Sequence, residues 1–125
     1  NYTANSLAAD EVVRAIRADG GRAMAVQADV ADEAQVLRMF EQVDAKFGRL
    51  TGLVNNAGVV DQRARLDEMD MTRWRRMFDI NVIGSLLCAR EAVRRMSTKH
   101  GGAGGAIVNV SSAASRLGSP GECVD

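Results

Sequence analysis

The sequence has few aromatic residues, no excess of charge and no long apolar run. Aromatic side chains make up 4% of its 125 residues, and the apolar fraction of 46% rests largely on alanine, which predicts closely packed helices and sheet. Sixteen basic residues balance sixteen acidic ones, so the composition gives no electrostatic argument for a nucleic acid or an anionic membrane as partner. No apolar run approaches the ~18 residues of a membrane-spanning helix, and the N-terminus shows no signal-peptide pattern.

Only two cysteines are present, Cys88 and Cys123, and their spacing fits neither a metal site nor a disulfide framework. We therefore expect reduced thiols, no metal and a cytoplasmic location. The chain begins at Asn1 without a methionine and ends at Asp125 in a loop-like run. We interpret it as the middle of a longer protein.

Helical patterns alternate with short apolar runs along the chain. The elements expected, in order, are a helix over 5–18, a strand over 22–30, a helix from Asp32 to Phe47, a strand over 50–56, a helix from Thr72 to about Met96, a strand over 106–110 and a loop over 113–125. Such alternation predicts βαβ crossovers and a parallel sheet, hence an α/β fold.

The two longer helices carry markers of their ends and of their buried faces. Asp32 is expected to cap the first, with Gln35 as the reciprocal cap, and Thr72 to cap the second. The residues expected on the buried line of the first are Val36, Phe40, Val43 and Phe47, and those on one line of the second are Trp74, Phe78, Asn81, Ser85, Cys88 and Ala92.

The segment Leu53-Val54-Asn55-Asn56-Ala57-Gly58 is the centre of the chain. An apolar run that ends in amides, alanine and glycine is typical of a buried strand that stops at a ligand crevice, where backbone must approach a ligand closely. In doubly wound sheets, ligands bind beyond the carboxyl ends of the strands. An ordinary turn after a strand favours the same residue types and is the alternative.

Three further positions could carry chemistry. Asn81 lies in the middle of a helix, where asparagine is a poor helix former and a buried amide needs partners; a helix-to-helix hydrogen bond is the alternative. Ser112 follows a buried strand and would face the same crevice as Asn55, or would only cap the next turn. Asp29 could bind a ribose or base, or merely end its strand.

Three motifs in order resemble the short-chain dehydrogenase/reductase family. They are Asn55-Asn56-Ala57-Gly58, Asn81-Val82-Ile83-Gly84 within a long helix, and Ile107-Val108-Asn109-Val110-Ser111-Ser112 after the last strand. The similarity covers essentially the whole chain and is greatest to bacterial 3-oxoacyl-carrier-protein reductases and glucose dehydrogenase-like oxidoreductases.

The resemblance implies a Rossmann-type doubly wound parallel sheet, incomplete here, with residues 1–125 as the central part of a single NAD(P)-binding domain. It implies hydride transfer between NAD(P) and a small carbonyl or alcohol substrate. Ser112 matches the serine that orients the substrate oxygen, and Asn81 the asparagine whose backbone carbonyl anchors a water for proton relay. The positions that match cofactor-binding residues are Asp29, Val30, Asn55, Ala57 and Gly58.

Several family features are missing from the chain. The Gly-rich phosphate turn is absent, and so are the catalytic tyrosine and its lysine. The only tyrosine is Tyr2, which does not match the position of the catalytic one. Counting on from Ser112, the family tyrosine would fall at about Asp125 or just beyond, and 119–122 resembles the loop before it. We therefore expect the parent protein to be active and this chain alone to be inactive; an inactive nucleotide-binding or oligomerisation module is the alternative.

The resemblance also bears on the cofactor, the topology and the assembly. The family's second strand usually ends in an acid when NAD is preferred, but Asn1 and Tyr2 occupy that region, which favours NADP over NAD. In the strand order 3-2-1-4-5-6, the strands at 50–56 and 106–110 are neighbours and 22–30 is separated from them. The helix over 72–96 matches the family's subunit-packing helix, so we expect a homo-oligomer, a tetramer or a dimer.

Overall fold

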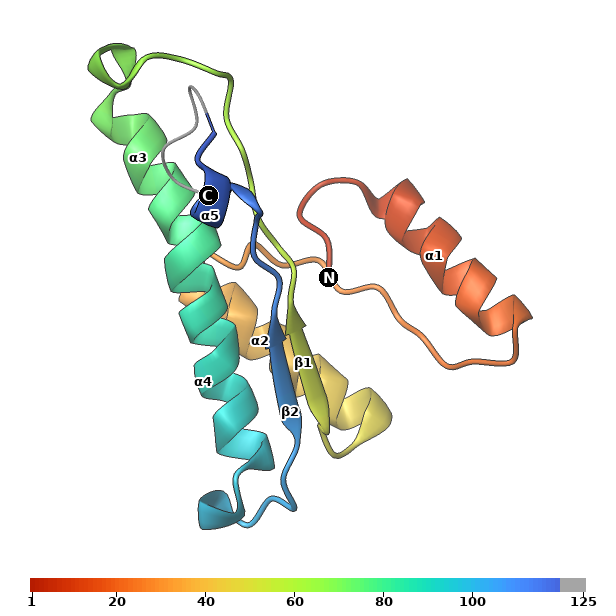
Figure 1. The fold of residues 1–125 in the computed structure, drawn as a ribbon. Helices are drawn as coiled ribbons and strands as arrows, with labels where there is room; N and C mark the ends of the chain where they lie inside the picture. The colour runs from red at the N-terminus through yellow and green to blue at the C-terminus, as the bar shows by residue number, and fades with distance from the viewer. Residues whose placement is uncertain (120–125) are drawn as a thin grey trace.

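The computed structural model describes residues 1–119 as an α/β fold (Figure 1). Its helices and strands are α1 (Ser6–Ala18), α2 (Glu33–Phe47), β1 (Gly52–Asn55), α3 (Met71–Phe78), α4 (Ser85–Met96), β2 (Ala106–Asn109) and α5 (Ala114–Leu117). A π-helical segment, Asp79–Gly84, joins α3 to α4, and 3-10 turns lie at Leu66–Glu68 and Thr98–His100.

The sheet consists of β1 and β2, paired in parallel with Gly52 opposite Ala106 and Asn55 opposite Asn109. This pairing confirms that the strands expected around 50–56 and 106–110 are neighbours. Helix α4 packs against both strands, and α2 packs against α4. The carboxyl ends of the two strands therefore lie side by side, beneath the polar segments that follow each of them (Figure 1).

The core lies between α2, α4 and the sheet. Its buried members are Val30, Val36, Phe40, Cys88, Ala92 and Met96. The expected buried line of α2 is confirmed at Val36 and Phe40. Asp32 caps α2 as predicted, since its side chain accepts a hydrogen bond from the backbone N of Gln35 at 3.1 Å. The Gln35 side chain instead accepts from the backbone N of Asp29.

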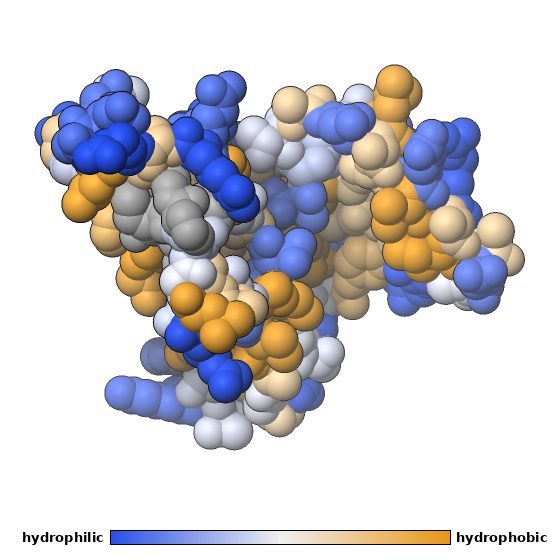
Figure 2. Space-filling model, turned by 45° about the horizontal axis from the view of Figure 1, so that its top comes forward, coloured by the Kyte–Doolittle hydropathy of each residue, from blue (hydrophilic) through white to orange (hydrophobic). Residues whose placement is uncertain are grey.

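Helix α1 stands away from this core (Figure 1). It covers the predicted range from Ser6 on, with Asn5 as its N-cap, but none of its residues is buried. Its apolar side chains are open to solvent, with Leu7 75% exposed, and orange apolar surface is visible on the right-hand part of the molecule, where α1 lies (Figure 2). The amphipathic pattern of α1 thus identifies the helix but not a packing partner within residues 1–119.

The strand expected over 22–30 is wrong as an element. Only an isolated parallel bridge forms there, between Tyr2 and Gln27, through hydrogen bonds from Tyr2 N to Val26 O and from Ala28 N to Tyr2 O. A strand needs a partner along its length, and residues 1–2 supply one residue of it. Across the described residues no strand pairing joins 22–30 to β1, in accord with the expected separation.

The long helix over 72–96 forms, with two corrections. Asp70, not Thr72, is its N-cap, since its side chain accepts from the backbone N of Arg73 at 2.8 Å. A π-helical turn contains more residues than an α-helical turn, so the segment Asp79–Gly84 rotates the side chains of α3 about the helix axis relative to those of α4. Phe78 is consequently half exposed, while Met77 is buried. Of the six residues expected on one line of the long helix, only Cys88 and Ala92 are buried.

The last part of the chain contains one further difference. A short helix, α5, lies inside the run expected to be a loop. The predictions made for 120–125, including the loop leading to a tyrosine and the thiol of Cys123, lie outside the described residues. Among residues 1–119, no helix has both the length and the apolarity needed to cross a membrane.

Candidate active site

Two cavities meet at the carboxyl end of β1; the second lies beyond the ends of β1 and β2, whereas the first extends along β1 and α2, where Phe40, Leu50 and Leu53 line it. The first has a volume of about 1110 Å³ and the second about 520 Å³. Residues 55–59 line both, so the segment predicted to sit at a ligand crevice runs between them. Asp29 and Val30 line the first cavity, and Asn81 and Ser112 line the second. The structure therefore brings Asn55, Asn81 and Ser112 together around one cavity.

Asn55 is the last residue of β1 and is buried. Its Nδ2 donates hydrogen bonds to the backbone carbonyl of Ser85 at 3.2 Å and to Oδ1 of Asn109 at 2.9 Å. Both amide hydrogens thus join β1 to α4 and β2, while the residues that follow, Asn56, Ala57 and Gly58, are exposed. Asn55 fixes the strand end from which that exposed segment departs.

Asn109 is a residue that the sequence analysis did not single out as part of the site. It is the last residue of β2 and lies directly opposite Asn55 in the parallel register. A signal was present in the sequence, because both strands end in asparagine at equivalent positions. Polar side chains facing each other at the ends of adjacent strands form cross-strand hydrogen bonds.

Asn81 lies in the π-helical segment, and its side chain binds one residue of the segment after β1. Its Oδ1 accepts a hydrogen bond from the backbone N of Val59 at 2.9 Å, and its Nδ2 donates to the Val59 carbonyl at 3.0 Å. The amide thus has a structural partner, as the alternative interpretation required, but that partner is loop backbone instead of another helix. The Asn81 carbonyl accepts from Oγ of Ser85 at 3.2 Å.

Ser112 combines the two interpretations that the sequence left open. Its Oγ accepts a hydrogen bond from the backbone N of Ala114 at 3.1 Å, which holds the start of the turn into α5. Its carbonyl accepts from Oγ of Ser115 at 2.7 Å. The side chain is exposed and lines the second cavity. Because Oγ acts as an acceptor in this bond, its own hydrogen is left to be donated to a ligand.

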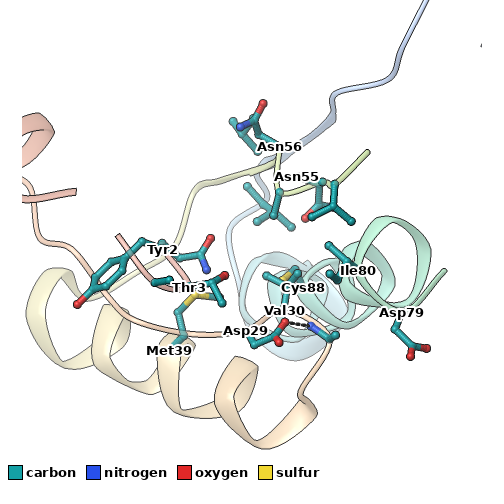
Figure 3. Close-up of a pocket in the computed structure, with 18 of the residues that line it drawn as sticks. Tyr2, Thr3, Asp29, Val30, Met39, Asn55, Asn56, Asp79, Ile80 and Cys88 are labelled. Atoms are coloured by element: carbon teal, nitrogen blue, oxygen red, sulfur yellow. Dashed lines mark hydrogen bonds between the residues drawn. The ribbon is translucent and has the colours of Figure 1, made fainter. Parts of the chain in front are cut away.

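Asp29 and Val30 form one wall of the first cavity, with Tyr2 and Thr3 on another side and Asn55 above them (Figure 3). Oδ1 of Asp29 accepts from the backbone N of Ala31 at 3.0 Å, so the side chain also ends its segment, as the alternative proposed. Val30 is buried against Gly84, where a Cβ would lie 2.7 Å from Val30 Cγ2.

Charged side chains line the first cavity, but no described residue that lines the second is charged. The charged residues that line the first are Asp29, Arg75, Arg76 and Asp79.

Cys88 also borders the first cavity, and burial raises the pKa of its thiol, with a further contribution from the negative charge of Glu91. The thiol therefore stays protonated at neutral pH, and its position in the core cluster is typical of a small packing residue.

The arrangement fits the dinucleotide that the sequence motifs imply. An elongated ligand could lie along residues 55–59, which border both cavities. The small, exposed Ala57 and Gly58 let its atoms approach the backbone closely. The second cavity, at about 520 Å³, has the size of a small-molecule site. Within the described residues, no cluster of histidine, cysteine, aspartate and glutamate could hold a metal ion.

Comparison with known proteins gives a consistent result. A sequence model described as short chain dehydrogenase matches residues 2–124. The chain is 51% identical over 125 residues to an uncharacterized oxidoreductase, YgfF, of Escherichia coli (strain K12), covering 100% of the chain and 51% of the relative. It is 39% identical over 122 residues to a 3-oxoacyl-[acyl-carrier-protein] reductase of Synechocystis, covering 98% of the chain and 48% of the relative.

A solved structure extends this similarity to the fold. A gluconate 5-dehydrogenase from Burkholderia cenocepacia, in complex with NADP and tartrate, matches with a TM-score of 0.81 at 31% identity, over 95% of this chain and 45% of that one. The chain thus spans about half the length of the relatives it matches. From its motifs, its fold and these similarities, the chain belongs to the short-chain dehydrogenase family, a family of Rossmann-type oxidoreductases that use NAD(P).

Proposed function

We propose that the complete protein carrying this chain transfers a hydride between NAD(P) and a carbonyl or alcohol substrate. The observation that carries the proposal is that Asn81 and Ser112 line one cavity, and that residues 55–59 connect it to the cavity bordered by Asp29 and Val30. Residues 1–125 would form the central part of a single NAD(P)-binding domain.

The cofactor would lie along both cavities. Asp29 and Val30 would contact its adenine end, and Ala57 and Gly58 would allow its close approach to the backbone. Asn55 would contribute by holding the strand end, because its amide hydrogens already bind Ser85 and Asn109. When bound, the nicotinamide ring supplies or accepts the hydride.

Ser112 would orient the reacting oxygen of the substrate. The hydrogen bond from Ala114 N to its Oγ polarises the hydroxyl and makes it a better donor. Such a fixed donor stabilises the negative charge that develops on a carbonyl oxygen. The backbone carbonyl of Asn81 would anchor a water for the proton relay.

A general acid is still required. Tyr2 is the only tyrosine, and it lines the first cavity, away from Ser112. The phenol and the accompanying lysine of the family would therefore be supplied outside these 125 residues, and we expect the chain alone to be inactive. For the same reason, a catalytically inactive nucleotide-binding or oligomerisation module is the second candidate.

Cofactor preference, assembly and location complete the proposal. No acidic residue is present among residues 1–4, which line the first cavity, and this favours NADP over NAD. A homo-oligomer would pack through α3 and α4, on which Phe78, Leu86 and Val93 are exposed. The absence of a cysteine framework favours the cytoplasm.

The complete protein would be mixed with NADPH and a panel of ketones, and loss of NADPH absorbance would be followed. We expect turnover with at least one ketone. Tight binding of NADPH, measured by its fluorescence, with no turnover of any carbonyl compound would favour the inactive module. A protein that neither binds nor oxidises NADPH would contradict the oxidoreductase and the nucleotide-binding module, and a size measurement would then test the oligomerisation module.

A further inference from the structure

The hydroxyl of Ser85 binds the backbone carbonyl of Asn81. Ser85 is the first residue of α4, directly after the π-helical segment, and its Oγ donates to that carbonyl at 3.2 Å. In an ordinary α-helix the backbone N of residue 85 would donate to the same carbonyl, four residues back. In this structure the backbone N of Ser85 donates to the Val82 carbonyl. The hydroxyl therefore takes the place that the backbone N has in an α-helix.

This hydrogen bond differs from the usual bond of a serine within a helix. Serine hydroxyls often bond the carbonyl four residues back, and they then share it with the backbone N of the same residue. In that case the backbone bond keeps the carbonyl in place without the hydroxyl. Because the backbone N of Ser85 is directed to Val82, the hydroxyl is the group of Ser85 that holds the Asn81 carbonyl. Its removal would leave the direction of this carbonyl less fixed.

Ser85 also joins Asn81 to the ends of both strands. Its own backbone carbonyl accepts a hydrogen bond from Nδ2 of Asn55 at 3.2 Å, and the same Nδ2 donates to Oδ1 of Asn109 at 2.9 Å. The hydrogen bonds therefore continue from β1 and β2, through Ser85, to the π-helical segment. All four residues line the second cavity. Connected hydrogen bonds of this kind strengthen one another and make a site more rigid.

We propose that Ser85 is a positioning residue of the active site, whose hydroxyl fixes the direction of the Asn81 carbonyl. This inference rests on the proposed function, in which that carbonyl anchors a water of the proton relay, and adds a residue to it. Ser85 would act through Asn81 and not on the substrate itself. Small displacements of a positioning group lower the rate of a reaction strongly, so loss of the hydroxyl should slow the step in which the proton moves.

Ser85→Ala in the complete protein would test this, because it removes the hydroxyl and keeps the backbone carbonyl that binds Asn55. Single-turnover oxidation of NADPH, with the ketone of the panel that is reduced fastest, measures chemistry apart from product release. We expect this rate to fall by about three- to tenfold, as the loss of one neutral hydrogen bond implies. Replacing H₂O by D₂O should slow the variant more than the unaltered protein, because proton transfer limits its rate more. The affinity for NADPH should be unchanged, since Ser85 lines only the second cavity.

Two variants serve as controls. Ser85→Thr keeps a hydroxyl that can bond the carbonyl four residues back, and should restore the rate to within about twofold of the unaltered protein. Ser97→Ala removes a hydroxyl just beyond the other end of α4, where Oγ accepts a hydrogen bond from Lys99 N and lines neither cavity. It should change neither the rate nor the effect of D₂O.

The possible failures of this inference and of the proposed function are distinct. Equal losses of rate in Ser85→Ala and Ser85→Thr would overturn the inference, because the hydroxyl would then not be the cause. A full rate in Ser85→Ala, or a lower rate with an unchanged effect of D₂O, would also overturn it while leaving the oxidoreductase proposal intact. If the unaltered protein oxidises NADPH with no carbonyl compound, the proposed function fails, and this inference with it.

Discussion

Asn81 binds Val59 through both backbone polar groups of that residue, with Oδ1 accepting from N at 2.9 Å and Nδ2 donating to O at 3.0 Å. The two bonds attach the segment after β1 to the π-helical segment. Gly58 lies next to the pair, since a Cβ at that position would be 3.5 Å from Asn81 Oδ1. One amide thereby fixes the shape of the border between the two cavities.

Replacing Asn81 by alanine should destabilise this border. The loss of both hydrogen bonds should lower the free energy of unfolding of the complete protein by about 1–3 kcal/mol and weaken NADPH binding. Urea denaturation and cofactor fluorescence would measure the two effects. Asn56→Ala is the control for stability, because this neighbouring side chain is exposed; a loss as large as that of Asn81→Ala would show that the amide pairing is not the cause.

Ser112→Ala should reduce kcat by about 10²–10³-fold, the loss found when one donor to a developing oxyanion is removed. NADPH affinity should change little. Ser115→Ala is the matched control, since it removes the hydrogen bond to the Ser112 carbonyl but keeps the Ser112 hydroxyl. Steady-state kinetics would separate the two. Equal losses in both variants would mean that the turn, and not the hydroxyl, matters for catalysis.

The sequence predicted the elements best where one face of an element is buried. The apolar line of α2 lies in the core, and Leu53 of β1 and Ile107 of β2 pack against that core. The strands were expected to be buried, but Val54 and Val108 are exposed. The segment at 22–30 has apolar residues of the right kind, but only Tyr2 pairs with it. The expected strand was wrong because a strand needs pairing along its length, and among the described residues only Tyr2 pairs with this segment.

The site was predicted in outline, but the geometry that joins its parts was not. Asn55, Asn81 and Ser112 were expected around one crevice, and they line one cavity. The π-helical segment left no signal in the sequence, so the shift that buries Met77 and exposes Phe78 could not be foreseen. The sequence also could not show that Asp70, and not Thr72, is the N-cap of α3. Both residue types serve as caps, and only the path of the chain decides between them.

Gly84→Ala should test the close approach of the long helix to Val30. A Cβ at position 84 would lie 2.7 Å from Val30 Cγ2 and 3.1 Å from the Val30 carbonyl oxygen. Overpacking of this kind costs about 1–3 kcal/mol, against a gain of at most about 1 kcal/mol in helix propensity, so a net loss of stability is expected. Chemical denaturation would measure it.

Two further variants identify the cause of that loss. Gly52→Ala should be nearly neutral, since the nearest atom to its Cβ would be 3.8 Å away. Adding Val30→Ala to Gly84→Ala removes the clashing methyl groups, so the double variant should lose less than the sum of the single variants. Strict additivity would show that the two residues do not compete for space.

Glu91 should make the stability depend on pH. Its side chain is 3% exposed and accepts hydrogen bonds from Arg94 at 2.7 Å and Arg95 at 2.9 Å. Burial by itself would raise the pKa of this carboxyl, but hydrogen bonds from Arg95 and Arg90 outweigh it and hold the pKa below its ordinary value of 4.5. A carboxyl with a lowered pKa in the folded state adds stability that is fully present above the ordinary pKa and is lost as the pH falls through the lowered one.

Glu91→Gln should therefore lower the free energy of unfolding by about 1–3 kcal/mol at neutral pH, because charge-assisted hydrogen bonds are lost. The difference from the unaltered protein should shrink once the pH falls below the lowered pKa, since protonated Glu91 then resembles glutamine. Urea denaturation at neutral and acidic pH would follow both changes. Glu41→Gln, on the exposed side of α2, should cost little at either pH. A Glu91→Gln penalty that stays constant with pH would show that packing of this side chain, and not its charge, accounts for its contribution to stability.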